Sequence, residues 1–110
     1  MTSPCGNKVV KISTSVADGA IPETVILCPG DQVTWVIEDP TKVKDFHIEV
    51  EDDPFEDNGP FHSKKPTSGK AKPPHPSKRY HHFKYTITVA GADGKTLPPF
   101  DPHGIILGGP

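Results

Sequence analysis

The chain has 110 residues, a net charge of −2 and an apolar fraction of 33%, so it has the size of one domain without a basic excess. Binding to nucleic acid would need such an excess, and a membrane-spanning helix would need about 20 consecutive apolar residues; the sequence offers neither. Fourteen prolines and ten glycines predict many turns and few long helices. We therefore expect one monomeric domain over residues 1–110, with no nucleic-acid partner and no membrane span.

The N-terminal sequence MTSPCGNKVV lacks the basic start and the apolar core of a signal peptide, so we expect an intracellular protein or a chain that begins at its mature end. The two cysteines, Cys5 and Cys28, flank the first two apolar runs, and two interpretations stay open. If these runs are neighbouring strands, the thiols can pair, which would stabilise the fold by about 3 kcal/mol and favour a periplasmic or extracellular location. Otherwise both are half-buried free thiols.

The first half of the chain is typical of short strands. β-branched residues are frequent in two runs, and the next two runs alternate apolar and polar residues. The four predicted strands cover residues 8–13, 23–28, 32–38 and 46–50. In the third, Val33, Trp35 and Ile37 share one face. Between the second and third strands, Pro29 and Gly30 predict a tight turn, because proline presets φ and glycine accepts a positive φ.

The segment from Glu51 to Arg79 is different in composition. It begins acidic and continues basic and proline-rich, as HSKKPTSGKAKPPHPSKR, without a clear strand or helix pattern. This composition favours a long extended or mobile loop, and such loops are usually functional or disordered. We therefore expect that deleting residues 57–77 would leave the fold intact and would remove any binding site carried by the loop.

Alternation returns in HFKYTITV, where Phe83, Tyr85, Ile87 and Val89 face one way. A turn is predicted at Asp93-Gly94, and a short closing strand at residues 105–107. These elements give six or seven short strands. The expected fold class is therefore all-β, a Greek-key β-sandwich of seven or so strands interrupted by the long Pro/Lys-rich loop at 51–79.

The segment VILCPGDQVTWVIED resembles the signature of the cupredoxins, the plastocyanin/azurin-type family, and the later order of elements is similar too. The positions of Cys5 and Cys28, each near an end of one of the first two strands, are also similar to the cysteine arrangement in azurin. The resemblance covers most of the chain outside residues 51–79. It implies a Greek-key sandwich and, in most members, electron transfer by a blue copper ion held by two histidines, a cysteine thiolate and a weak axial ligand.

This sequence departs from that pattern at the copper site. In the family the thiolate ends the tyrosine-containing strand, where this chain has Val89, and no cysteine follows Cys28. The only methionine is Met1. A valine side chain cannot bind copper, so we expect no blue site.

Two histidines remain candidate metal ligands. His47 matches the family's first histidine by order, but it alternates with Phe46 and Ile48, so it faces solvent unless a bulge reverses its side. His103 is close to the position of the family's axial ligand. If both turned inward, they would form a two-nitrogen site, and the addition of Asp101 or Glu49 would suit it to non-blue copper or zinc. The adjacent pair His81-His82 would point to opposite faces and could not chelate one ion.

Enzymatic motifs are lacking, so we expect no catalysis. The sequence favours a cupredoxin-like binding or structural module without a type 1 copper site. Its partner would be a protein or small ligand at the end carrying His47, His103 and the loop. No cofactor is certain, and copper is the candidate. The alternative is a non-blue copper or zinc protein that uses His47 and His103 for metal handling or electron transfer.

Overall fold

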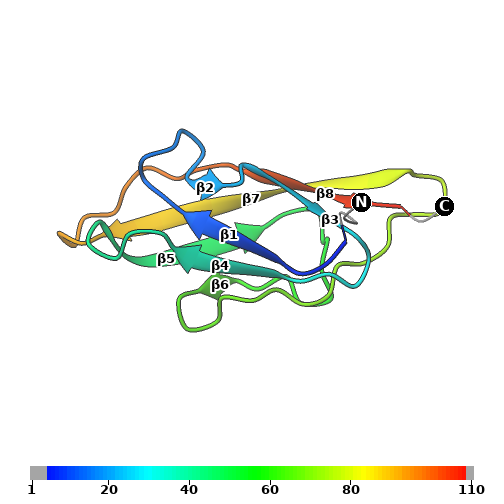
Figure 1. The fold of residues 1–110 in the computed structure, drawn as a ribbon, viewed down its shortest axis with the longest axis horizontal. Helices are drawn as coiled ribbons and strands as arrows, with labels where there is room; N and C mark the ends of the chain where they lie inside the picture. The colour runs from blue at the N-terminus through cyan, green and yellow to red at the C-terminus, as the bar shows by residue number, and fades with distance from the viewer. Residues whose placement is uncertain (1–4, 109–110) are drawn as a thin grey trace.

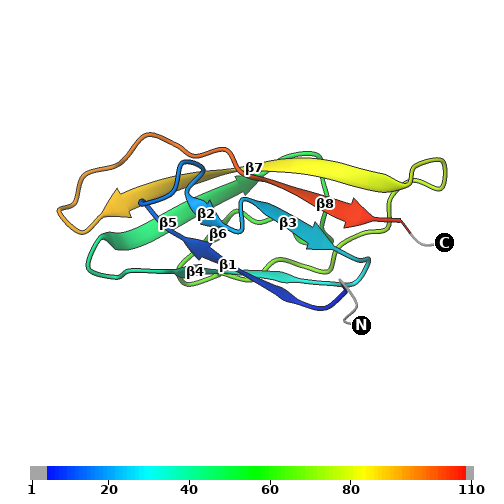
Figure 2. The ribbon, with the colours of Figure 1, turned by 45° about the horizontal axis from the view of Figure 1, so that its top comes forward.

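The computed structural model describes residues 5–108, which form eight strands in two mixed sheets and no helix (Figures 1 and 2). The first sheet has the order β2-β1-β4 and the second has the order β3-β8-β7-β5-β6. The strands are β1 (Lys8–Ile12), β2 (Ala20–Ile21), β3 (Thr24–Leu27), β4 (Val33–Ile37), β5 (Val43–Val50), β6 (Phe61–His62), β7 (Tyr80–Gly91) and β8 (His103–Leu107). Nothing in this described part of the chain is a helix able to cross a membrane.

All six strands predicted from the sequence are present, because alternation is a local signal of a half-buried strand. In β7, Phe83, Tyr85, Ile87 and Val89 are all buried, as expected. The two sheets pack face to face through an aromatic cluster. Trp35 of β4 stacks on Phe61 at a centroid distance of 5.1 Å and meets the edge of Tyr85 at 5.5 Å. The core therefore lies between the sheets and is filled by large rings.

Two of the strand pairs are parallel: β1 with β4, and β3 with β8. The remaining ladders are antiparallel. The predicted turns are also in place. Gly30 has φ +91° in the turn before β4, and Gly94 has φ +85° after β7. The coarse expectation of an all-β, two-sheet fold is confirmed.

Residues 51–79 contain only the two-residue strand β6 and are otherwise irregular, as expected of a long extended loop, but the expectation that residues 57–77 can be deleted with the fold intact is wrong. Phe55, Phe61 and Ala71 from this segment are buried in the core. Its backbone also runs along the open edge of β4, where Trp35 N donates to Pro66 O at 2.9 Å and Ser68 N donates to Val33 O at 2.8 Å. The segment therefore covers a sheet edge and closes the sandwich, and deleting residues 57–77 would remove part of the core.

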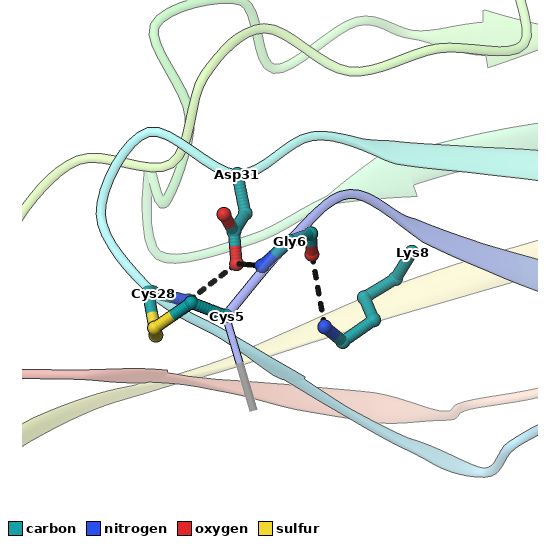
Figure 3. Close-up of a disulfide and its surroundings, with 5 residues drawn as sticks. All are labelled: Cys5, Gly6, Lys8, Cys28 and Asp31. Atoms are coloured by element: carbon teal, nitrogen blue, oxygen red, sulfur yellow. Dashed lines mark hydrogen bonds between the residues drawn. A yellow bond between two sulfur atoms is a disulfide. The ribbon is translucent and has the colours of Figure 1, made fainter. Parts of the chain in front are cut away.

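The amino end of the described chain is fixed by a disulfide between Cys5 and Cys28, so the paired interpretation of the two thiols is confirmed (Figure 3). Beside it, the carboxylate of the buried Asp31 accepts hydrogen bonds from Gly6 N at 3.0 Å and from Cys28 N at 2.9 Å. Lys8 Nζ donates to Gly6 O at 2.9 Å. The disulfide and the Asp31 hydrogen bonds thus join the start of β1 to the end of β3, and we call the disulfide together with the turn at residues 28–31 the clip.

Candidate functional site

His47 lies in the middle of β5, on the outer face of the five-stranded sheet. Its side chain is 48% exposed, and Nε2 lies 3.4 Å from Glu49 Oε1. β5 does contain a bulge, between Val43 and Asp45, but His47 still alternates with buried Phe46 and Ile48. An exposed pair of this kind contributes little to stability.

The surroundings of His47 are polar and shallow. Its partner on β6 is His62, and the nearby Asp45 shares the outer face. A hydrogen bond from the Ser63 hydroxyl holds the pKa of Asp45 below its usual value, with smaller contributions from backbone donors and from His62. The hollow beside His47 has a volume of about 150 Å³, whereas small-molecule sites usually exceed roughly 300 Å³. This surface therefore does not form a ligand pocket.

His103 begins β8 on the same outer face and is held on both sides. Its Nε2 lies 2.7 Å from the Thr24 hydroxyl on β3, and its Nδ1 lies 2.9 Å from Nε2 of His82 on β7. The two imidazole rings meet edge to face, with centroids 5.1 Å apart and an interplanar angle of 76°. Three neighbouring strands thus supply one polar chain of Thr24, His103 and His82.

The structure does not bring His47 and His103 together. His47 is paired with Thr88, and His103 is paired with Lys84, on opposite sides of β7. Two strand spacings across the sheet and four residues along it separate their Cα atoms by roughly 16 Å. One ion cannot contact both side chains over that distance.

The remaining histidines have local contacts. His81 hydrogen-bonds through Nε2 to the carbonyl oxygen of Asp52 at 2.8 Å, whereas His82 contacts His103, so the prediction that His81 and His82 diverge is confirmed. His75 bonds Ser77 in an exposed turn. Within residues 5–108, no group of three or more histidine, cysteine or carboxylate side chains is arranged to hold a metal ion.

Sequence reasoning missed His82 as the neighbour of His103. The alternation of β7 already placed His82 outward, together with Lys84. The missing information was the register of β7 against β8, in which His103 pairs with Lys84 and His82 lies two residues further along. A diagonal pair of this kind is within reach of long side chains, but no local pattern specifies it.

Apolar side chains lie beside the histidine pair on the outer face, toward the carboxyl end of β8. Ile26 of β3 is 44% exposed and Tyr80 of β7 is 57% exposed. Ile105 and Leu107 of β8 lie between them in the sheet order and are half-buried. We call Ile26, Tyr80, Ile105 and Leu107 the apolar face. Three cations, Lys78, Arg79 and Lys84, are exposed beside it.

Comparisons of the chain with protein-family models, with curated proteins and with solved structures gave no match.

Proposed function

We propose that this chain is a cupredoxin-like binding module without a type 1 copper site, and that it binds a partner protein through its apolar face. The observation that carries the first half is the disulfide: Cys5 and Cys28 are the only cysteines in the sequence, and they are bonded to each other. A blue copper site needs a cysteine thiolate as ligand. This chain has no thiolate to offer while the disulfide is intact.

The arrangement of β5 and β7 supports the same view. Val89, at the position expected for the family's cysteine, is fully buried and paired with Phe46. His47, the expected histidine ligand, faces the opposite side of the sheet. The two-sheet fold and the cysteines near the ends of β1 and β3 are compatible with a Greek-key cupredoxin.

The apolar face supports a protein partner. Exposed apolar side chains that lie together, with a polar rim, are typical of interaction sites. Here Ile26 and Tyr80 are the most exposed members, and the cations Lys78, Arg79 and Lys84 lie at the rim. A complementary partner would present apolar side chains with acidic residues around them, because opposite charges speed association and set orientation.

The disulfide also supports a compartment. Such bonds persist mainly in oxidising environments, so we place the working protein in the periplasm or outside the cell.

The copper half of the proposal is tested by loading. Purified, oxidised protein without a histidine tag is titrated with Cu(II) and followed by absorption spectroscopy. We expect no intense blue band. An intense blue band from the disulfide-bonded protein would overturn the proposal.

The binding half is tested by capture from an extract of the source organism. We expect the double variant Ile26→Ser/Tyr80→Ser to lose the captured partner and to keep its melting temperature. The matched control is Val9→Ser, which changes a side chain 58% exposed on β1 of the other sheet. Equal capture by the double variant and the wild type would reject the apolar face as the binding surface.

The alternative, a non-blue copper or zinc protein that uses His47 and His103 together, loses support because roughly 16 Å separates their Cα atoms.

A further inference from the structure

Two imidazole nitrogens on adjacent strands point at one another. His82 Nε2 and His103 Nδ1 are 2.9 Å apart, on the exposed outer face. One of them must carry the hydrogen of this contact and the other must accept it, because a neutral imidazole has one N–H and one lone pair. If the shared hydrogen moves to the far nitrogen of the donor ring, two lone pairs are left close to a single point.

Thr24 prepares His103 for this role. The Thr24 hydroxyl lies 2.7 Å from His103 Nε2, so Nε2–H can donate to Oγ1. This arrangement leaves Nδ1 with the lone pair and fixes the orientation of the ring. Metal-binding histidines usually make such a bond through their other nitrogen, since it sets the tautomer and the direction of the ligand. Thr24 is the backbone partner of His103 in the β3–β8 ladder, so the sheet itself holds this pair in place.

We propose that His82 Nε2 and His103 Nδ1 together bind one divalent transition-metal ion of the Cu(II) or Zn(II) class. Metal–nitrogen bonds of about 2.0 Å to two atoms 2.9 Å apart give an angle of roughly 90°, which suits tetragonal Cu(II). A separation of about 3.3 Å would give the tetrahedral angle that zinc prefers. The rings must turn so that their lone pairs converge beside the line joining them. His82 is exposed and has room to turn.

The donor set also predicts selectivity. Imidazole suits copper, zinc and nickel, whereas calcium and magnesium need several oxygen ligands. Lys84 pairs directly with His103 across the sheet, so its positive charge lowers the affinity for any cation and leaves the selectivity to the imidazole ligands. With only two protein ligands, the other positions belong to water, and the ion exchanges readily.

The histidine pair and the apolar face can be tested separately. Ile26→Ser/Tyr80→Ser, which tests the apolar face, changes neither imidazole and should bind copper as the wild type does. Wild-type capture by this double variant would thus reject only the first proposal, and a lack of saturable copper binding by the wild type would reject only the second.

The test is a calorimetric titration of the full, oxidised, tag-free chain with Cu(II). We expect one saturable site, with affinity lowered at least about 10-fold in both His82→Ala and His103→Ala. The matched control is His47→Ala, another exposed histidine of the same sheet face, which should leave the affinity unchanged. Thr24→Val should lower the affinity by roughly 10- to 100-fold, as expected for loss of a residue that orients a ligand.

Electron paramagnetic resonance of the Cu(II) complex supplies a second readout. We expect nitrogen couplings from two imidazoles in the wild type and from one imidazole in each single variant. Three results would overturn the proposal: no saturable binding, unchanged affinity in the His82→Ala/His103→Ala double variant, or an equal loss in His47→Ala. The last two would identify adventitious binding at other histidines.

Discussion

Removing the disulfide is the perturbation whose cost can be worked most directly from the fold. Cys5 and Cys28 are 23 residues apart, and the enclosed loop contains β1, β2 and β3. In the chain-entropy model, closing a loop of this length stabilises the folded state by about 3.4 kcal/mol at 25 °C. For a domain of this size, such a change lowers the melting temperature by about 15 °C.

The assay is differential scanning calorimetry with and without a thiol reductant, on the wild type and on the double variant Cys5→Ala/Cys28→Ala. We expect the reduced wild type and the variant to melt at the same temperature. The reductant should leave the melting temperature of the variant unchanged. Asp31 accepts hydrogen bonds from Gly6 N and Cys28 N, and we expect these bonds to keep the same segments joined in the reduced protein. The measured loss of stability should therefore come mainly from the greater conformational entropy of the unfolded chain without the cross-link.

Two results would refute this reasoning. A fall below about 4 °C would mean that the cross-link removes little freedom from the unfolded state. A loss of native circular dichroism at room temperature would mean that the clip, rather than the core, holds the two sheets together. The second result would also limit the working protein to oxidising compartments more strictly than we propose.

Three further predictions concern single residues. Gly69→Ala should lower the free energy of unfolding by about 2 kcal/mol, because the new Cβ would lie 2.3 Å from Asp57 N. The control Lys70→Ala, at the exposed next position, should leave it unchanged, and equal urea denaturation midpoints for the two variants would mean that the segment is not packed. Asp31→Ala should cost about 3 kcal/mol in the same assay, since two backbone N–H groups lose a charged acceptor, and a cost below about 1 kcal/mol would contradict their bonds. Burial raises the pKa of Tyr85 to about 12, although the adjacent indole of Trp35 lowers it in part. The unfolded state therefore releases this proton at lower pH than the folded state does, so the free energy of unfolding should fall by about 1.4 kcal/mol per pH unit as the pH rises from 10 to 12. Tyr85→Phe should remove that part of the decline and be no less stable at pH 7, because the buried hydroxyl has no hydrogen-bond partner; an unchanged alkaline decline would show that Tyr85 ionises freely in the fold.

The strands could be predicted because their signal is local. In β7, burial alternates strictly from Phe83 to Val89, and the sequence alone gives that pattern. The two-residue strands β2 and β6 were missed, since two residues carry no periodicity. The disulfide stayed one of two alternatives, because pairing depends on how the ends of β1 and β3 lie in space.

The segment 51–79 was misjudged for a different reason. Its prolines and charges are typical of a loop, but three anchors at Phe55, Phe61 and Ala71 bury it without any regular spacing. A chain that covers one edge of β4 needs backbone hydrogen bonds on that side only. Pro66, which has no N–H, still serves as acceptor for Trp35 N. A high proline content therefore argues against a strand paired on both sides, but it does not argue against a segment that pairs with the edge of a sheet on one side only.

One of the two histidines in contact had been selected from the sequence. His103 was selected because it is close to the position of the cupredoxin axial ligand, and in the fold its Nδ1 lies 2.9 Å from His82 Nε2. His47 was selected by order along the chain, and the sheet places it on the far side of β7. Residue order thus identified a ligand candidate, while strand register decided its partner.

The filled interior explains why binding must use the outside of this sandwich. Trp35, Phe61 and Tyr85 occupy the space between the sheets, and Val89 is fully buried. An ion or ligand entering there would displace close-packed rings, at a cost of several kcal/mol for each. Binding on the outer face has no such cost, and there the histidine pair lies beside the apolar face. A partner that covers the apolar face would therefore also control access to the open coordination positions, so metal and partner affinities should be coupled by the same factor in both directions.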